Sequence, residues 1–295
     1  MTDAVTDAMT NAVRAAATSP RPLSLAFSPC PNDTFIFNAW VDGLLDGAPA
    51  IELTFADVDV TNGAAERGEF DVVKVSYAAL PWLLDKYALL PTGGALGRGC
   101  GPLVLTAGRA DLHGATVAVP GERTTAYLLF RLWAAEIGIG DGLTIEVMPF
   151  ADIMPAVRDG KVDAGLVIHE ARFTYGNYGL TSNVDLGEWW ETTTGLPIPL
   201  GAILAKRELD IASIAAVVRA SVEHAFANPD ASKAFVAEHA QEMNPDVQAR
   251  HIALYVNDFS VDLGDEGYSA VEKLLTRAAA AGLVPPIEPG LLSSS

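Results

Sequence analysis

The sequence is poor in cysteine, and this shortage excludes two classes of small stabilised domain. The only cysteines in 295 residues are Cys30 and Cys100. Neither has a potential metal ligand beside it at useful spacing, so a zinc site and a disulfide scaffold are both unexpected. A chain with reduced thiols is the simpler interpretation, although a single disulfide between the two cysteines stays open.

Basic residues and long apolar runs are also scarce. The 19 Lys and Arg stand against 37 Asp and Glu, which gives a formal net charge of −18. A chain this acidic repels phosphate backbones and anionic lipid. We therefore expect no nucleic-acid partner and no membrane partner. No apolar run approaches the ~20 residues of a membrane-spanning helix. Residues 1–22 lack the basic start and apolar core of a secretory signal. We expect them to be a frayed polar tail on a cytoplasmic chain.

What the sequence does have is an alternation of β-rich runs and helical patterns, which predicts an α/β protein with parallel sheets. Strands are expected at Leu23–Phe27, Ile51–Phe55, Val72–Val75, Thr116–Val119, Leu143–Met148 and Ala164–Ile168. Helices are expected at Asp33–Leu45, Thr61–Arg67, Thr124–Ile137 and Asp152–Arg158, and the region from Asp210 to Ala281 is mostly helical. We therefore assign residues 23–108 and 204–295 to a first lobe, on which the C-terminal helices pack, and residues 109–203 to a second.

A short motif occurs twice, as Gly68-Glu69-Phe70-Asp71 and as Gly160-Lys161-Val162-Asp163. In each copy, a glycine suited to a left-handed helix cap precedes a buried strand. One copy in each lobe would make two similar units that face each other across a cleft. Ligands of open α/β sheets bind at the carboxyl ends of the strands. These ends are predicted at Lys74-Val75-Ser76 and at His169-Glu170.

His169 is the first candidate for chemistry. It follows a strand-forming run in LVIHEARFTY, residues 166–175. Its reference pKa of about 6.5 suits proton abstraction near neutral pH. A lone histidine is more often structural or exposed, so its place at a strand end is what favours a catalytic base. Adjacent strand residues point to opposite faces, so Glu170 is not expected to orient the ring. Weaker cases are His113, His224, His239 and His251.

The segment PGERTTAYLLFRLW, residues 120–133, is a loop that runs into a helix. Thr124 or Thr125 is a natural N-cap, and the free N–H groups at such a helix start bind carboxylate or phosphate. Capping alone would explain the threonines. Together with Lys74 and Ser76 on the opposite rim, the helix start predicts an anion site. Asp33, near the carboxyl end of the first strand, is a second-tier candidate for a polar substrate contact, whereas Cys30 has no identifiable partner that would make it a nucleophile.

Several longer motifs occur together and in order. They are SPCPNDTFIF (28–37), GGALGRGCGPLV (93–104), PGERTTAY (120–127), IHEARFTY (168–175), DLGEWWETTTGLPIPLGAI (185–203) and YVNDFSVDLGDEG (255–267). As a set, they resemble the 1,4-dihydroxy-6-naphthoate synthases of the futalosine route to menaquinone. The resemblance extends from about Leu23 to the C-terminal helices.

This resemblance implies a two-lobed fold like that of type II periplasmic binding proteins, with a central ligand cleft. It also implies a carbon-carbon lyase acting on a small molecule, cyclic dehypoxanthine futalosine, with no metal and no other cofactor. The proposed base of the family falls on His169. Its substrate-contacting segments fall on Lys74-Val75-Ser76 and on Thr125-Ala126, with Thr124 as a second-tier contact.

Other functions are compatible with such a fold. A non-catalytic binding protein would use the same scaffold to capture a solute, because fold alone does not define function. A sister enzyme similar to chorismate dehydratase is a second alternative, but the SPCPNDTF and IHEARFTY motifs argue against it. A ligand-sensing regulator would need a DNA-binding segment, which the sequence does not offer.

Overall fold

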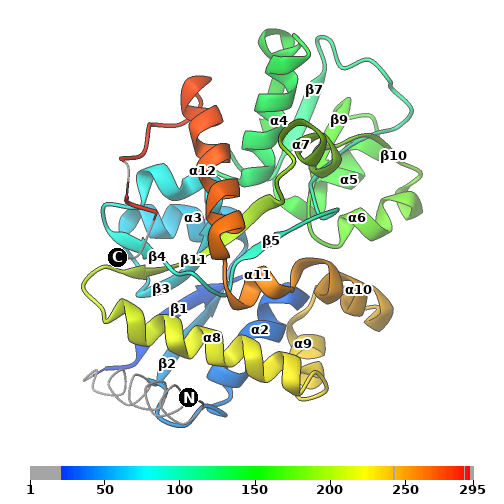
Figure 1. Ribbon diagram of the computed structural model, residues 1–295. Coiled ribbons are helices and arrows are strands. Elements are labelled where there is room, and N and C mark those ends of the chain that lie inside the picture. Colours follow the sequence, from blue (N-terminus) through cyan, green and yellow to red (C-terminus); the bar gives the residue numbers. More distant parts are fainter. Residues whose placement is uncertain (1–20, 242, 289, 293–295) are drawn as a thin grey trace.

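A computed structural model describes residues 21–241, 243–288 and 290–292 of the chain. The tail predicted at residues 1–22 therefore lies almost wholly outside the described residues. Figure 1 shows two β-sheets in opposite halves of the molecule, each flanked by helices. This arrangement confirms the predicted two-lobed α/β fold. Within the described ranges, no helix is long and apolar enough to cross a membrane.

The sheet of the first lobe has the strand order β2-β1-β3-β11-β4, and β5 also pairs with β11. Its strands are β1 (Leu23–Phe27), β2 (Ile51–Phe55), β3 (Val72–Ser76), β4 (Tyr87–Leu89), β5 (Ala95–Gly97) and β11 (Ile198–Lys206). Strand β1 runs parallel to β2 and β3, as predicted, whereas β11 runs antiparallel to β3. The sheet is therefore mixed rather than purely parallel.

The sheet of the second lobe has the order β10-β6-β9-β7-β8. Its strands are β6 (Leu103–Thr106), β7 (Thr116–Val119), β8 (Thr144–Val147), β9 (Ala164–Val167) and β10 (Thr181–Asp185). The predicted lobe boundaries at residues 108 and 203 are shifted, because β6 belongs to the second sheet and all of β11 belongs to the first. The chain crosses between the lobes at residues 98–102, between β5 and β6, and at residues 195–197, between α7 and β11.

The helices cover both sheets and link the lobes. In the first lobe are α2 (Pro31–Val41), α3 (Val58–Arg67), the 3₁₀ helix η1 (Tyr77–Trp82), α8 (Ile211–Ala227), α9 (Lys233–His239), α10 (Pro245–Tyr255) and α11 (Asp258–Val261). In the second are α4 (Thr125–Glu136), η2 (Gly140–Gly142), α5 (Phe150–Arg158), α6 (Ala171–Thr174), η3 (Tyr175–Tyr178) and α7 (Leu186–Thr194). The C-terminal block packs on the first lobe through α2, and α12 (Gly264–Ala280) contacts both β11 and α4.

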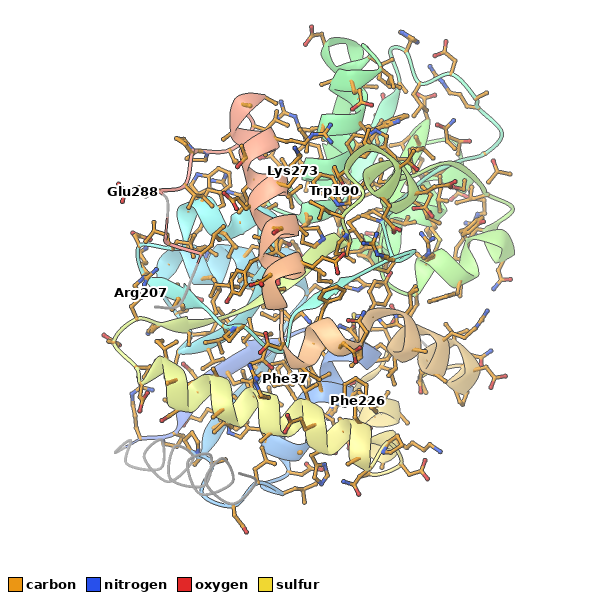
Figure 2. The ribbon with its side chains drawn as sticks, viewed as in Figure 1. Phe37, Trp190, Arg207, Phe226, Lys273 and Glu288 are labelled. Carbon is orange, nitrogen blue, oxygen red and sulfur yellow. The ribbon has the colours of Figure 1, made fainter. Side chains whose placement is uncertain are left out.

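One buried apolar cluster runs through both lobes, and each lobe also has a smaller cluster of its own. In the first lobe, Phe37 of α2 is fully buried and stacks on Phe27 of β1 with ring centroids 4.6 Å apart. Trp190 of α7 is fully buried beside the second lobe, and its indole donates to the carbonyl of Pro197 at 3.0 Å. Figure 2 labels Phe37 and Trp190 in the separate halves. The two lobes are therefore joined by a continuous buried cluster as well as by the crossing segments.

The repeated motif has the same structural role in both lobes: its glycine ends a helix and its aspartate links two parallel strands. Gly68 and Gly160 adopt left-handed φ values of 74° and 68°. The aspartate three residues after each glycine accepts a hydrogen bond from a backbone N–H at the start of the neighbouring parallel strand, β1 or β7. Asp71 accepts from Ser24 N at 2.9 Å, and Asp163 accepts from Thr116 N at 2.8 Å. The motif thus pins the last parallel strand to the first in each unit.

Replacing Asp71 with asparagine should destabilise the fold by about 2 kcal/mol, the scale of hydrogen bonds to a charged group. Burial alone would raise the pKa of the Asp71 carboxyl, but hydrogen bonds from Arg21 and Ser24 outweigh it and hold that pKa well below its usual value. The stabilisation is complete above the unfolded-state pKa of about 3.9 and declines as pH falls toward the depressed folded-state pKa. Urea unfolding at pH 7 and at pH 3 measures this loss.

Asp163→Asn is the matched control, because the Asp163 side chain is 38% exposed whereas that of Asp71 is fully buried. At pH 7, Asp163→Asn should lower the free energy of unfolding by less than Asp71→Asn does. Equal losses of unfolding free energy in the two variants, or a loss in Asp71→Asn that does not shrink in acid, would contradict the assignment.

Two glycine backbones touch where the chain crosses between the lobes. Gly101 lies between β5 and β6, and Gly187 lies in the first turn of α7. A Cβ atom added to Gly101 would lie 2.1 Å from the backbone nitrogen of Gly187. Since backbone cannot give way as a flexible side chain can, only glycine allows this approach.

Gly101→Ala should therefore lower the unfolding free energy by about 3 kcal/mol, at the upper end of overpacking costs. Gly176→Ala is the control, because an added Cβ there meets nothing within 4 Å and the residue has no left-handed φ. Thermal unfolding of the two variants checks the prediction, which is wrong if both melt at the temperature of the unmodified protein.

Candidate active site

A cleft between the lobes contains most of the predicted functional residues. It comprises about 670 Å³ of unfilled space, part of it open to solvent. The polar side chains that line it are Ser28, Asn32, Asp33, Thr61, Lys74, Ser76, Thr124, Thr125, His169, His251 and Tyr255. Those of the threonine pair and His169 come from the second lobe, and the others come from the first. A ligand in this cleft would contact both lobes.

His169 enters the cleft from the end of β9, as predicted. Its φ is +55°, and among the described residues it is the one non-glycine residue with a positive φ. Such backbone strain is concentrated at functional sites. Burial is the main cause that lowers the pKa of the imidazole to about 4, so the ring is neutral at pH 7. A neutral imidazole in a ligand cleft is a competent proton acceptor.

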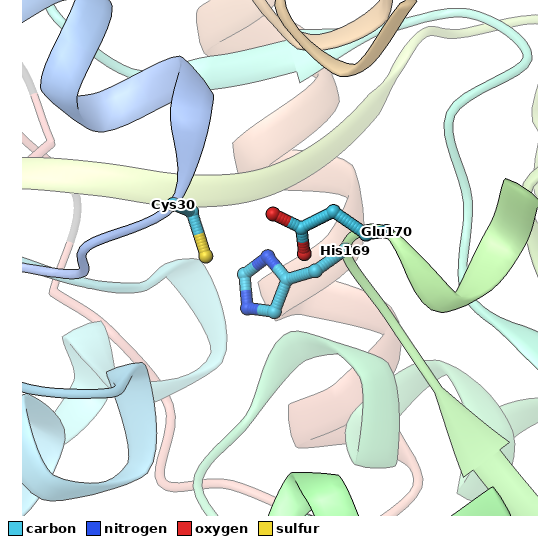
Figure 3. A group of neighbouring side chains, drawn as sticks. All are labelled: Cys30, His169 and Glu170. Atoms are coloured by element: carbon cyan, nitrogen blue, oxygen red, sulfur yellow. The ribbon is translucent and has the colours of Figure 1, made fainter. Parts of the chain in front are cut away.

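The left-handed conformation of His169 corrects the expectation for Glu170. Strand β9 ends at Val167, and Glu170 has helical φ and ψ values of −66° and −21°. Strand alternation therefore no longer applies, and both side chains turn to the same region. A carboxylate oxygen of Glu170, a ring nitrogen of His169 and the sulfur of Cys30 lie within 4.8 Å of one another. Figure 3 shows the three side chains converging from two segments of the chain.

Lys74 and Asp33 form a buried ion pair at the floor of the cleft. Lys74 is 6% exposed and Asp33 is 2% exposed, and the Lys74 ammonium donates to Oδ1 of Asp33. Asp33 also accepts from Ser28 Oγ at 2.8 Å and from Asn32 Nδ2 at 2.7 Å. Buried charges need partners of this kind. The sequence predicted both residues as substrate contacts but did not predict that they pair with each other.

His251 is a cleft residue that the sequence analysis ranked too low. It is fully buried on α10, and its Nε2 lies 2.9 Å from Oδ1 of Asn32. Its ring stacks on that of His169 with centroids 6.1 Å apart, and Tyr255 lies one helical turn further on, 4.5 Å away. The spacing of four residues between His251 and Tyr255 is the signal that could have identified one face of this helix.

The helix start in the second lobe has the predicted cap. Thr124 is the N-cap of α4, because its hydroxyl accepts from Tyr127 N at 3.2 Å. The hydroxyl of Thr125 instead bridges the lobes, since it donates to Leu200 O at 2.8 Å and accepts from Ala78 N at 3.2 Å. A ligand anion would therefore meet the backbone N–H groups of the first turn of α4 rather than these hydroxyls.

The remaining predicted residues divide into two groups. Ser76 and Ala126 line the cleft, and Ser76 Oγ accepts from Asn62 Nδ2 at 3.1 Å. Val75 is fully buried in the apolar core and is not among the residues that line the cleft. Alternation along β3 explains the difference, because Lys74 and Ser76 share the face opposite to Val75.

Cys30 and Cys100 are both buried free thiols. Burial is the main cause that raises the pKa of each thiol, to about 12 for Cys100 and well above its usual value for Cys30. Neither is a thiolate near pH 7, so neither is suited to nucleophilic attack. In the described part of the chain, the donor atoms of Cys30, His169 and Glu170 nevertheless lie close enough together to hold a metal ion.

The two lobes and their shared cleft place the chain in a class with known structures, the periplasmic-binding-protein-like fold. The Escherichia coli aliphatic sulphonate binding protein SsuA has a TM-score of 0.65 and 15% identity, covering 91% of this chain and 90% of that one. A crystal structure of an Archaeoglobus fulgidus protein has a TM-score of 0.84 and 33% identity, covering 89% of this chain and 98% of that one.

Residues 23–280 match the family model for menaquinone biosynthesis, and the chain belongs to this family. A Streptomyces coelicolor 1,4-dihydroxy-6-naphthoate synthase is 64% identical over 92% of this chain and 98% of its own length. A Thermus thermophilus protein of the same name is 47% identical over 90% of this chain and 96% of its own length. The resemblance drawn from the motifs is thereby confirmed, and the protein is an enzyme of menaquinone biosynthesis.

Proposed function

We propose that this chain is a carbon-carbon lyase that converts cyclic dehypoxanthine futalosine to 1,4-dihydroxy-6-naphthoate, with His169 as the general base. The observation that carries the proposal is the neutral imidazole of His169 in the cleft between the lobes. The names of the two relatives supply the product. The cytoplasmic location and the independence of cofactors stay predictions.

In this mechanism, His169 removes a proton from the bound cyclic intermediate and opens the spiro-linked sugar remnant. A small polyol fragment is then eliminated, and formation of the aromatic naphthalene drives the reaction. The free base form that this step needs is present at pH 7, because the pKa of His169 is about 4. Closure of both lobes on the substrate would exclude water and hold the reacting carbon near the ring.

The product carries a carboxylate, which the substrate shares. The first turn of α4 is a suitable place for it, because the unpaired N–H groups and the helix dipole both favour an anion. Ser76 lines the cleft at the end of β3 and can hold a second polar group of the substrate. Lys74 is already paired with Asp33, so we assign this pair to the polar wall of the cleft rather than to the chemistry.

The direct test is incubation of the purified protein with cyclic dehypoxanthine futalosine, with mass spectrometry and absorbance to detect 1,4-dihydroxy-6-naphthoate. Calorimetry under the same conditions measures binding. We expect multiple turnovers. Tight binding without turnover would show a solute-binding protein instead, and dehydration of chorismate in a parallel incubation would show the sister enzyme.

A further inference from the structure

Folding brings four potential metal-binding groups to one corner of the cleft. No metal is expected from the sequence, since neither cysteine has a ligand beside it along the chain. In the fold, the sulfur of Cys30 at the start of α2 meets His169 and Glu170 from the end of β9, with all three donor atoms within 4.8 Å (Figure 3). The Nδ1 atom of His251 lies 3.8 Å from Oε1 of Glu170.

The hydrogen bonds around His251 determine which of its nitrogens carries the proton. Asn32 Nδ2 donates to Asp33 at 2.7 Å, which fixes the amide so that its oxygen faces His251. That oxygen can only accept, so Nε2 of His251 is the protonated nitrogen and Nδ1 has a free lone pair. This Nδ1 atom is fully buried and has no hydrogen-bond partner in the described part of the chain.

This is the arrangement found around metal-bound histidines. Such a histidine donates one ring N–H to a neighbouring acceptor, which orients the other nitrogen toward the ion. Here Asn32 is the acceptor, and the ion pair of Asp33 and Lys74 anchors Asn32 in turn. A bare, buried nitrogen that points at a carboxylate 3.8 Å away is otherwise unfavourable.

The donor types select the metal. Thiolate, imidazole and carboxylate together suit Zn²⁺, whereas Mg²⁺ requires oxygen ligands in an octahedron. Two anionic ligands, Cys30 and Glu170, would balance the two charges of the cation in a buried site. Tetrahedral zinc needs donor atoms roughly 3.5 Å apart, so Cys30, His169 and Glu170 must move together by about 1 Å. His251, which lies outside this group of three, must move further.

We propose that Cys30, His169 and Glu170, with Nδ1 of His251 as the fourth ligand, form a binding site for Zn²⁺, and that its occupation inhibits the enzyme. On binding, the Cys30 thiol loses its proton to solvent and a sulfur–zinc bond forms, with no change in oxidation state. The ion also takes the lone pair of the His169 imidazole. The inhibition rests on His169 being the base, as proposed above, whereas the binding itself does not.

The binding test uses the chelator-treated full chain and needs no activity. Zn²⁺ is titrated in competition with a chromophoric chelator, and Co²⁺ serves as a spectroscopic probe. We expect one equivalent of Zn²⁺ and a thiolate-to-cobalt charge-transfer band. Cys30→Ser should abolish the band and weaken Zn²⁺ binding at least about 10-fold, as loss of a ligand should cost no less than loss of a supporting residue. Cys100→Ser, which alters the other buried thiol of the cleft, should retain both signals.

The outcomes separate the two proposals. Absence of the cobalt band in the unmodified protein, or equal Zn²⁺ affinity in the Cys30→Ser and unmodified proteins, overturns the metal site. If the site binds Zn²⁺ and the naphthoate still forms at the full rate, the inhibitory role is overturned. Failure of the metal-free protein to convert the substrate would overturn the proposed function and leave the binding result intact.

Discussion

Replacement of His169 by asparagine is expected to lower kcat by about 100- to 10 000-fold, the contribution of a well-placed general base. Asparagine is chosen because, apart from glycine, it is among the residues that best tolerate the left-handed backbone at this position. The loss should therefore come from the missing base rather than from a distorted turn. Steady-state kinetics on cyclic dehypoxanthine futalosine measures kcat, and calorimetry measures substrate affinity, which should change by only a few-fold.

His113→Ala is the control for this result, since that side chain is 69% exposed on a turn and is not among the residues that line the cleft. It should leave kcat unchanged. Full activity in His169→Asn would disprove the base assignment while leaving the family membership untouched. A loss of substrate affinity as large as the loss of kcat would instead assign His169 to binding.

The second large effect is expected at the buried ion pair. Lys74→Met should lower the unfolding free energy by about 3–5 kcal/mol, because it leaves the Asp33 carboxylate buried without its cation. Asp33→Asn/Lys74→Met should recover most of this loss, since the amide can keep neutral hydrogen bonds with Ser28 and Asn32. Urea unfolding of the two single variants and the double variant gives the coupling energy.

An exposed pair gives the contrast. Lys233 lies 2.7 Å from Asp230, but both side chains are at least three-quarters exposed. Lys233→Met should cost no more than about 0.5 kcal/mol, as solvent-exposed pairs do. If the double variant at the cleft is as unstable as Lys74→Met alone, an unpaired charge is not the cause of the loss.

Much of the fold could be predicted from local pattern. The ranges predicted for β1 and β2 coincide with those observed, and β3 is longer by a single residue, Ser76. Five strands escaped prediction, β4, β5, β6, β10 and β11, and three of them have a clear physical reason. β4 and β5 have only three residues each, and β11 contains Pro199 and Gly201, residues that argue against a strand interior. The register of β11 against β5 does shift between those two residues.

The candidate-site residues at strand ends could be predicted from the sequence. Those brought together by long-range packing could not. His169, Lys74 and Ser76 follow from the rule that ligands of open α/β sheets bind at the carboxyl ends of the strands, here one strand in each lobe. The contact between Asn32 and His251 spans 219 positions, and nothing local to either residue indicates it. Nothing local to Cys30 indicates a role either, because His169 and Glu170 beside it come from the other lobe.

The division of the site between lobes has a kinetic consequence. His169 and Glu170 belong to one lobe, whereas Cys30, Lys74 and His251 belong to the other. A form with the lobes apart would hold only half of the reactive surface, and a ligand that contacted one lobe would meet no complete set of groups. In the proposed reaction, a substrate would therefore have to contact both lobes before His169 could act on it. In that reaction, intermediates would arise only while both lobes hold the ligand, and early release of half-processed substrate would be suppressed.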